Sequence, residues 1–335
     1  MKKYDIYGIG NALLDLDFEV SVETLNRLNI DKGVMTLIDE NKHHFLLEEL
    51  DSVKHLKACG GSSANTIFAM QQLGSRTYYS FKIGDDAAGE FFYQNIINEG
   101  IHTNLNDYPR EGITGKCIVL VTPDADRTMN TFLGATSNFS VEQLSYNAIV
   151  NSEYLYIEGY LVAQATGQIA AIEAHQHAKA HGIKTAISLS DPNMVTYFKE
   201  GLLKIIGDQV DILFCNEDEA LLFTKTESLS HAREELKKYA KSFVVTLGAK
   251  GALVYDGDAF ALVPPYKTKV VDTVGAGDIF AGVFLHAITE GHDYVSAADF
   301  ANYAASKVVS KYGPRLNNNE MNEIQSFLLN KIAAI

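Results

Sequence analysis

A glycine turn followed by one carboxylate is the most chemically suggestive stretch of this sequence. Gly275, Ala276, Gly277 and Asp278 stand between an apolar pair and a run apolar enough for a buried helix. Free N–H groups at the first turn of a helix bind anions, and the helix dipole reinforces them. A carboxylate beside such a site can accept a proton from a hydroxyl. Asp278 is therefore a candidate general base, although a simple helix cap would use the same residue type.

Two further groups of residues could hold hydroxyls. Gly61, Ser62 and Asn65 lie in a second glycine turn that opens a predicted helix, and Asn11 and Asp15 follow the first predicted strand. An ionised carboxylate can accept hydrogen bonds from two adjacent hydroxyls, which suits the cis-diol of a sugar. The alternative for Asp15 is an ordinary exposed strand residue.

Candidates for metal and phosphate contacts are spread along the chain. Asn216 and Glu219 follow the strand 210–215 and share one helix face, where they suit Mg²⁺ held through water. The alternative is that these residues only form an acidic helix start, which the helix dipole favours. No G-x-x-x-x-G-K-[ST] motif occurs, so the backbone of the Gly275 turn would form the anion site. Arg127, at the lip of a predicted hairpin, would then be the mobile cation, unless it is a solvated turn residue.

Composition excludes several classes of partner. The net charge is −14 and the pI is near 5.1, which argues against binding to nucleic acid or to an anionic membrane. Cys59, Cys117 and Cys215 are far apart, so we expect reduced, buried thiols rather than disulfides or a metal site. No signal peptide or membrane-spanning run fits the sequence, and the cytoplasm is the default location.

The order of predicted elements indicates an α/β fold. Strands and helices alternate from residue 154 onward, which implies a mostly parallel sheet covered on both faces. Ligands then bind at the carboxyl ends of the strands. Three extended pieces at about 12–20, 33–38 and 113–134 break this rhythm, and we expect them to form a small sheet that acts as a lid. No linker or repeat is evident, so residues 1–335 are predicted to form a single domain.

Together these residues resemble the ribokinase/PfkB carbohydrate kinase family. The N-terminal signature is matched by Gly60-Gly61-Ser62-Ser63-Ala64-Asn65, and the C-terminal one by Asp272-Thr273-Val274-Gly275-Ala276-Gly277-Asp278. The match covers nearly the whole chain in order. Segments 10–15, 156–160 and 210–220 look most like the adenosine kinase branch. The resemblance implies a three-layer α/β/α, ribokinase-like fold with a mostly parallel central sheet and a small β-sheet lid.

The resemblance also implies a role for each matched residue. Asp278 would be the base, Gly275, Ala276 and Gly277 the anion hole, and Arg127 a phosphate contact. The sugar would be held by Asn11, Asp15, Gly61, Ser62 and Asn65. ATP would lie near Thr246, Gly248, Gly251 and Asn302, with Mg²⁺ served by Asn216 and Glu219, while Asp272 and Val274 match part of a K⁺ site found in family members. The nucleobase pocket would be lined by Cys117, Met129, Thr131, Leu133 and Tyr160.

The sequence therefore predicts an ATP-dependent kinase that phosphorylates a primary hydroxyl of a ribose-like substrate, with adenosine as the first choice. Adenosine kinases carry a Gln in the second lid segment, where this chain has Val34-Met35-Thr36, and a Phe where it has Tyr160. Other nucleosides thus stay open. So do two further alternatives: a kinase for ribose or a ketohexose, and a non-catalytic nucleotide-binding regulator. The expected partner is a small molecule, and the protein is expected to be a monomer or a homodimer through the lid.

Overall fold

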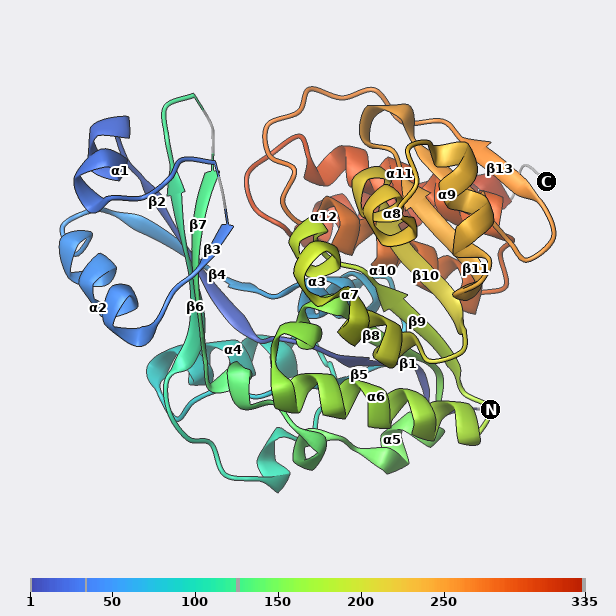
Figure 1. Cartoon of the computed structure of the whole chain (residues 1–335), viewed down its shortest axis with the longest axis horizontal. Helices are drawn as coiled ribbons and strands as arrows, with labels where there is room; N and C mark the ends of the chain where they lie inside the picture. Colours follow the sequence, from blue (N-terminus) through green and yellow to red (C-terminus); the bar gives the residue numbers. More distant parts are fainter. Residues whose placement is uncertain (1, 34, 125–126, 333–335) are drawn as a thin grey trace.

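The structure is a mixed α/β fold with one large and one small sheet, as the sequence predicts. The computed structural model describes residues 2–33, 35–124 and 127–332. Val34, Ala125 and Asp126, which fall within the predicted lid segments, lie outside the described residues. In Figure 1 the small sheet stands beside the larger body, with helices α1 and α2 on its far side.

The large sheet has the strand order β13-β12-β11-β10-β9-β8-β1-β5. Neighbouring strands pair in parallel from β5 to β11. Strands β12 and β13 pair antiparallel and form one edge of the sheet. The mostly parallel arrangement is confirmed. The strands are β1 Tyr4–Ile9, β5 Thr77–Ser80, β8 Ser152–Glu158, β9 Lys184–Ser188, β10 Val210–Asn216, β11 Ala240–Thr246, β12 Ala252–Tyr255 and β13 Phe260–Val263.

Helices cover both faces of this sheet, because alternate strand residues belong to two separate apolar cores. One core contains α3 Ser62–Gln72, α4 Ala87–Asn98, α10 Ala276–Thr289, α11 Tyr294–Val308 and α12 Asn318–Ile332. The other contains α5 Tyr146–Val150, α6 Ala165–Ala180, α7 Pro192–Ile206, α8 Glu217–Thr224 and α9 Leu229–Leu236. This gives the three predicted layers.

The small sheet has the order β3-β7-β6-β2-β4. Its strands β2 Leu13–Glu19, β3 Met35–Leu37, β6 Thr114–Val121 and β7 Arg127–Gly134 fall within the predicted lid segments. The fifth, β4 His55–Gly60, was not expected from the sequence, because its first four residues are exposed and show no apolar alternation. Helices α1 Val22–Leu28 and α2 Glu40–Glu49 contribute buried leucines to the apolar core on one side.

Side chains of the small sheet alternate strictly between that core and the opposite face. Leu14 and Leu16 of β2 and Ile118 of β6 are buried in the core, whereas Asp15 of β2 and Cys117 of β6 line a cavity on the other face. This is the period of two that a strand imposes on its side chains. The cavity face of the small sheet therefore follows directly from the strand register.

Helices α3 and α10, which follow the two glycine turns, pack directly against each other. The contact is close at Gly282, where an added Cβ would lie 2.7 Å from the Thr66 carbonyl oxygen and 2.8 Å from the Ala69 Cβ. Glycine is required here because no side chain fits between the two backbones. The contact brings the N-termini of the two helices to the same place.

Two further expectations concern the chain as a whole. Cys59, Cys117 and Cys215 are free and buried, as predicted. Within the described ranges, no helix has both the length and the apolar character that crossing a membrane requires.

Candidate active site

A cavity of about 540 Å³ lies between the small sheet and the carboxyl ends of strands β1, β8, β9, β10 and β11. Residues just beyond those strand ends line it, among them Asn11, Tyr160, Asp191 and Thr246. This is the edge at which ligands bind in parallel α/β sheets. Most of the predicted site residues line it too. The exceptions are Gly251, Asn302 and Asp272.

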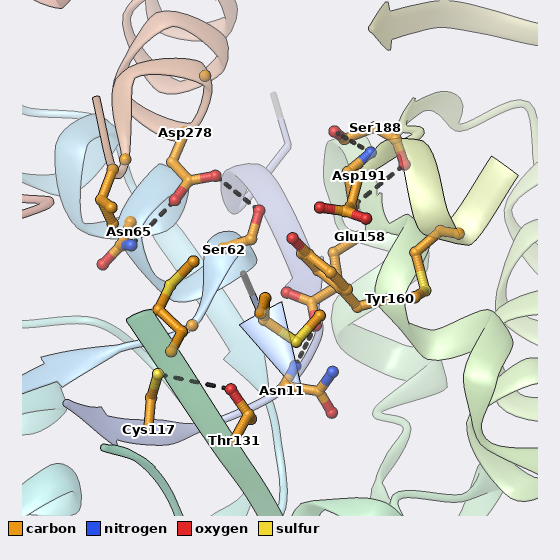
Figure 2. Close-up of a pocket in the computed structure, with 18 of the residues that line it drawn as sticks. Asn11, Ser62, Asn65, Cys117, Thr131, Glu158, Tyr160, Ser188, Asp191 and Asp278 are labelled. Carbon is orange, nitrogen blue, oxygen red and sulfur yellow. Dashed lines mark hydrogen bonds between the residues drawn. The ribbon is translucent and has the colours of Figure 1, made fainter. Parts of the chain in front are cut away.

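Asp278 lies in the first turn of α10, at the wall of the cavity. Its Oδ1 accepts a hydrogen bond from Ser62 Oγ at 2.6 Å, and its Oδ2 accepts one from Asn65 Nδ2 at 2.9 Å (Figure 2). Burial raises the pKa of Asp278, while the Ser62 and Asn65 hydrogen bonds and the Arg315 charge lower it. Ser62 and Asn65, expected at the sugar, thus hold the candidate base in this structure.

Both glycine turns depend on glycine for steric reasons. Gly275 caps α10 with φ 77°, and an added Cβ would lie 2.5 Å from Pro314 Cβ. Gly61 caps α3 with φ 98°, and its Cβ would lie 2.2 Å from the Asn11 carbonyl oxygen. Because φ is positive and a neighbouring atom lies close, any residue other than glycine would be costly at either position. Gly275, Ala276 and Gly277 line the cavity at the start of α10, and the Ala276 amide donates to the Thr273 carbonyl oxygen.

The small sheet supplies a wall whose residues form cross-strand rows. In one row Leu37, Thr131, Cys117 and Asp15 are successive partners across β3, β7, β6 and β2. Thr131 Oγ1 donates to Cys117 Sγ at 3.4 Å (Figure 2). Met35, Met129 and Leu133 extend the apolar surface, and Thr36 does not line the cavity. The wall is thus mostly apolar, with polar groups at Asp15, Arg127 and Thr131.

Asp15 projects from this wall into the cavity, with room made by Gly60, where an added Cβ would lie 2.3 Å from Asp15 Oδ2. Burial and the neighbouring Asp17 raise the pKa of Asp15 to about 7, although Arg315 and Arg127 act in the opposite sense. A carboxylate in this position is well placed to accept hydrogen bonds from ligand hydroxyls. Asn11 lies nearby, and Thr136 Oγ1 and Gln164 Nε2 both donate to its Oδ1 at 3.1 and 2.7 Å.

Arg127 contacts carboxylates in this structure. Its Nη2 lies 3.0 Å from Asp17 Oδ1, and its Nη1 lies 2.9 Å from Asp272 Oδ2. The first contact stays within the small sheet, whereas the second joins that sheet to the loop before α10. Arg127 also lines the cavity. A phosphate at this position would compete with these two carboxylates for Arg127.

The predicted metal residues form a capping box at the start of α8. Asn216 Nδ2 donates to Glu219 Oε1 at 2.6 Å, and the Glu219 amide donates to Asn216 Oδ1 at 2.8 Å. Glu219 is nevertheless at the cavity wall, and burial raises its pKa to about 7. Within the described part of the chain, no cluster of three or more His, Cys, Asp or Glu could hold a metal directly. A carboxylate that reaches a hydrated, phosphate-bound Mg²⁺ through water fits this arrangement.

The residues predicted around ATP divide into two groups. Thr246 and Gly248 line the cavity beyond β11. Asn302 instead donates from Nδ2 to the carbonyl oxygens of Val263 and Pro264 at 3.2 and 3.0 Å, and the Cβ position of Gly251 faces the same Val263 oxygen. Asn302 thus stabilises the end of β13, and Gly251 leaves room for that strand end to approach closely. The Asp272 carboxylate accepts from the amides of Val274 and Gly313 in addition to Arg127.

Glu158 is a site residue that the sequence analysis did not single out. Its buried carboxylate accepts a hydrogen bond from the Asn11 amide at 2.7 Å (Figure 2). It accepts a second one from the Ser63 amide at 2.8 Å. It therefore ties the end of β1 to the start of α3. Burial raises the pKa of Glu158 to about 8. A lone Glu at a strand end carries no sequence signal of this role, because its partners are backbone amides distant in the chain.

These buried carboxyls predict a stability that falls as the pH rises. Asp15, Glu158 and Glu219 have folded-state pKa values of about 7 to 8 but ordinary values of 3.8 to 4.5. Between those values the folded state binds more protons than the unfolded state, so raising the pH destabilises the fold. His43 and His286, whose pKa burial lowers to about 4, act oppositely but only below their ordinary value of 6.5.

Between pH 7 and 8 the carboxyls dominate, because the histidines are then mostly neutral in both the folded and the unfolded state. Urea midpoints measured across that window are expected to decline steadily for the wild type and less steeply for Glu158→Gln. A wild-type midpoint that rises across the window would contradict the raised pKa values.

Comparisons with known proteins agree with this geometry. The family model described as "pfkB family carbohydrate kinase" matches residues 32–321 of this chain. The crystal structure of adenosine kinase from Sinorhizobium meliloti has a TM-score of 0.88 and 33% identity, covering 97% of this chain and 99% of that one. A probable sugar kinase from Rhizobium etli has a TM-score of 0.89 and 29% identity, covering 98% and 100%. Adenosine kinase 1 of Arabidopsis thaliana is 27% identical over 332 residues, which is 92% of this chain and 94% of that protein.

Proposed function

This chain belongs to the pfkB family of carbohydrate kinases, and from that membership we propose that it transfers the γ-phosphoryl group of ATP to the 5′-hydroxyl of adenosine. The observation that carries the proposal is the Asp278 carboxylate at the first turn of α10, facing a cavity whose opposite wall presents Asp15. A base, an anion site and a hydroxyl-binding carboxylate then converge on one space. The family membership and the glycine turns set aside the non-catalytic alternative.

The proposed mechanism is in-line transfer. Asp278 accepts the proton of the attacking hydroxyl, and Asp15 and Asn11 hold the sugar from the other side. The first amides of α10 stabilise the negative charge that develops on the transferred group. Arg127 adds a positive charge when it exchanges its Asp272 contact for a phosphate oxygen. Closing the small sheet over the cavity would exclude water.

Family membership implies Mg²⁺ as a cofactor and suggests K⁺ as a second cation. Mg²⁺ neutralises phosphate charge when it is bound with ATP, and Glu219 would hold it through water. The K⁺ site expected at Asp272 and Val274 stays a prediction. The Asp272 carboxylate already accepts three hydrogen bonds, one of them from Arg127, so K⁺ would compete there with the Arg127 charge.

Adenosine is proposed over free sugars because of the wall that the small sheet provides. Met35, Cys117, Met129, Thr131 and Leu133 give an apolar surface on the scale of a nucleobase. A sugar alone would leave that surface uncovered. The S. meliloti relative is named an adenosine kinase. The second candidate is a sugar kinase, which the similarity to the R. etli protein favours.

A coupled ADP-release assay tests the substrate. With adenosine, inosine, guanosine, cytidine, ribose and fructose as acceptors, we expect kcat/KM for adenosine to exceed that for ribose by ~10–100-fold, the worth of burying one large apolar group. An Asp278→Asn preparation serves as the blank for background ATP hydrolysis. Activity on a free sugar with none on adenosine would refute the substrate assignment and leave the kinase assignment intact.

A further inference from the structure

Arg315 is a largely buried cation that the proposed mechanism does not use. It lies in the loop between α11 and α12, with its guanidinium carbon 3.7 Å from the centre of the Phe68 ring. Its Nε donates to Asn65 Oδ1 at 2.8 Å, and its Nη1 donates to Asn95 Oδ1 at 3.0 Å. A buried charge is expensive unless it is hydrogen-bonded, so its placement beside Asn65 calls for an explanation.

The contact with Arg315 fixes which way the Asn65 amide points. A guanidinium carries only donors, so its partner on Asn65 must be the side-chain oxygen. The amide nitrogen then necessarily faces Asp278, where Nδ2 donates to Oδ2 at 2.9 Å (Figure 2). The other carboxylate oxygen is held by Ser62 Oγ at 2.6 Å. A flipped Asn65 would instead present its oxygen to the Asp278 carboxylate and repel it.

We propose that Arg315 is a positioning residue for phosphoryl transfer, because it locks the Asn65 amide and thereby fixes the orientation of the Asp278 carboxylate towards the acceptor hydroxyl. The proposal rests on the proposed function of Asp278 as the base. Arg315 itself does not line the cavity. It acts through one intervening side chain, from a loop more than 200 residues away from Asn65 in sequence.

The charge of Arg315 also matters because the other ionisable groups near Asp278 are acids or phenols. They come from β2, β8 and the 3₁₀ helix Gly159–Ala163, and they are Asp15, Tyr156, Glu158 and Tyr160. None of these four groups carries a positive charge that would favour the ionised form of Asp278. Arg315 lowers the pKa of Asp278 against burial. Arg315 acts on Asp15 in the same sense. Removing its charge is therefore expected to raise the pKa of both carboxyls and to move the acidic limb of the pH profile upward.

The test compares three variants by kcat, KM and the pH profile of kcat/KM, using the full chain with ATP, Mg²⁺ and adenosine. Arg315→Met keeps the apolar stem over Phe68 but removes the charge and the Asn65 contact. It is expected to lower kcat by ~10–100-fold, the scale of a misplaced reacting group, and to shift the acidic limb to higher pH. Arg315→Lys keeps the charge without the planar fork, so kcat should fall while the acidic limb stays in place.

Asn95→Ala is the matched control, because it removes the other hydrogen-bond partner of the same guanidinium and leaves Asn65 and Asp278 untouched. It is expected to keep the wild-type profile. The proposal is overturned if Arg315→Met keeps the wild-type acidic limb and loses activity only in proportion to its folded fraction. If Arg315→Met does not fold, wild-type kcat in Arg315→Lys overturns the proposal instead. Asp278→Asn measured alongside tests the base itself, so failure of the proposed function is seen separately.

Discussion

Replacing Asp278 by Asn is expected to lower kcat by ~10²–10⁴-fold, the range for loss of a general acid–base group. Asn keeps the size of the side chain but cannot accept the proton of the acceptor hydroxyl. One of its two donors, Ser62 or Asn65, would then face an amide N–H. The melting temperature should change little compared with the loss of turnover, because Asp278 borders the cavity rather than an apolar core.

The measurement is steady-state kinetics with adenosine and ATP, paired with a thermal melt. Ser62→Ala is the control, because it removes one hydrogen bond to the carboxylate but leaves the base in place. It should cost less activity than Asp278→Asn. Near-wild-type turnover in Asp278→Asn would reject the mechanism.

Replacing Gly275 by Ala is expected to disable both the fold of the anion site and catalysis. The residue has φ 77°, and its Cβ would lie 2.5 to 2.6 Å from three atoms of Pro314. The backbone strain alone is of the order of 1–3 kcal/mol. The loop that must move carries Gly313, which donates to Asp272, and Arg315, which holds Asn65. Loss of stability and loss of kcat should therefore appear together.

Gly277→Ala separates the two effects. Gly277 lies within α10 and lines the cavity, and an added Cβ would meet no atom within 4 Å. Ala is a better helix former than Gly, so stability should be kept or slightly raised. The methyl group nevertheless occupies space where the phosphates are proposed to bind, so KM for ATP should rise. Equal stability in the two variants, by urea denaturation, would contradict the strain assigned to Gly275.

The alternation of strands and helices could be predicted from the sequence because it is a local signal. Apolar runs and glycine turns predicted the parallel sheet, and the structure confirms the three-layer fold. Strand β4 was missed because residues 55–58 are exposed and lack apolar alternation. Only its pairing with β2, more than 35 residues earlier, makes it a strand. Such pairing is a property of the tertiary structure and leaves no local pattern.

Residues of the candidate site could likewise be predicted where the signal is local. Asn11 stands at a strand end and Asp278 in a glycine turn, whereas Asp15 lies within β2, and all three line one cavity. The hydrogen-bond partners were not predictable from sequence. Glu158 binds two backbone amides, and Arg315 reaches Asn65 from the C-terminal loop. These contacts depend on how distant segments meet, and no spacing rule encodes them.

The close packing of α3 against α10 has a consequence for how this protein can evolve. The two helices set the separation of Ser62, Asn65 and Asp278, and Gly282 allows no side chain between them. Substitutions there would alter the transfer chemistry for every acceptor at once. The small sheet contributes its cavity face through alternate residues that do not touch that helix pair's contact at Gly282. Mutations of that face are therefore expected to change the acceptor preference without disturbing the helix pair.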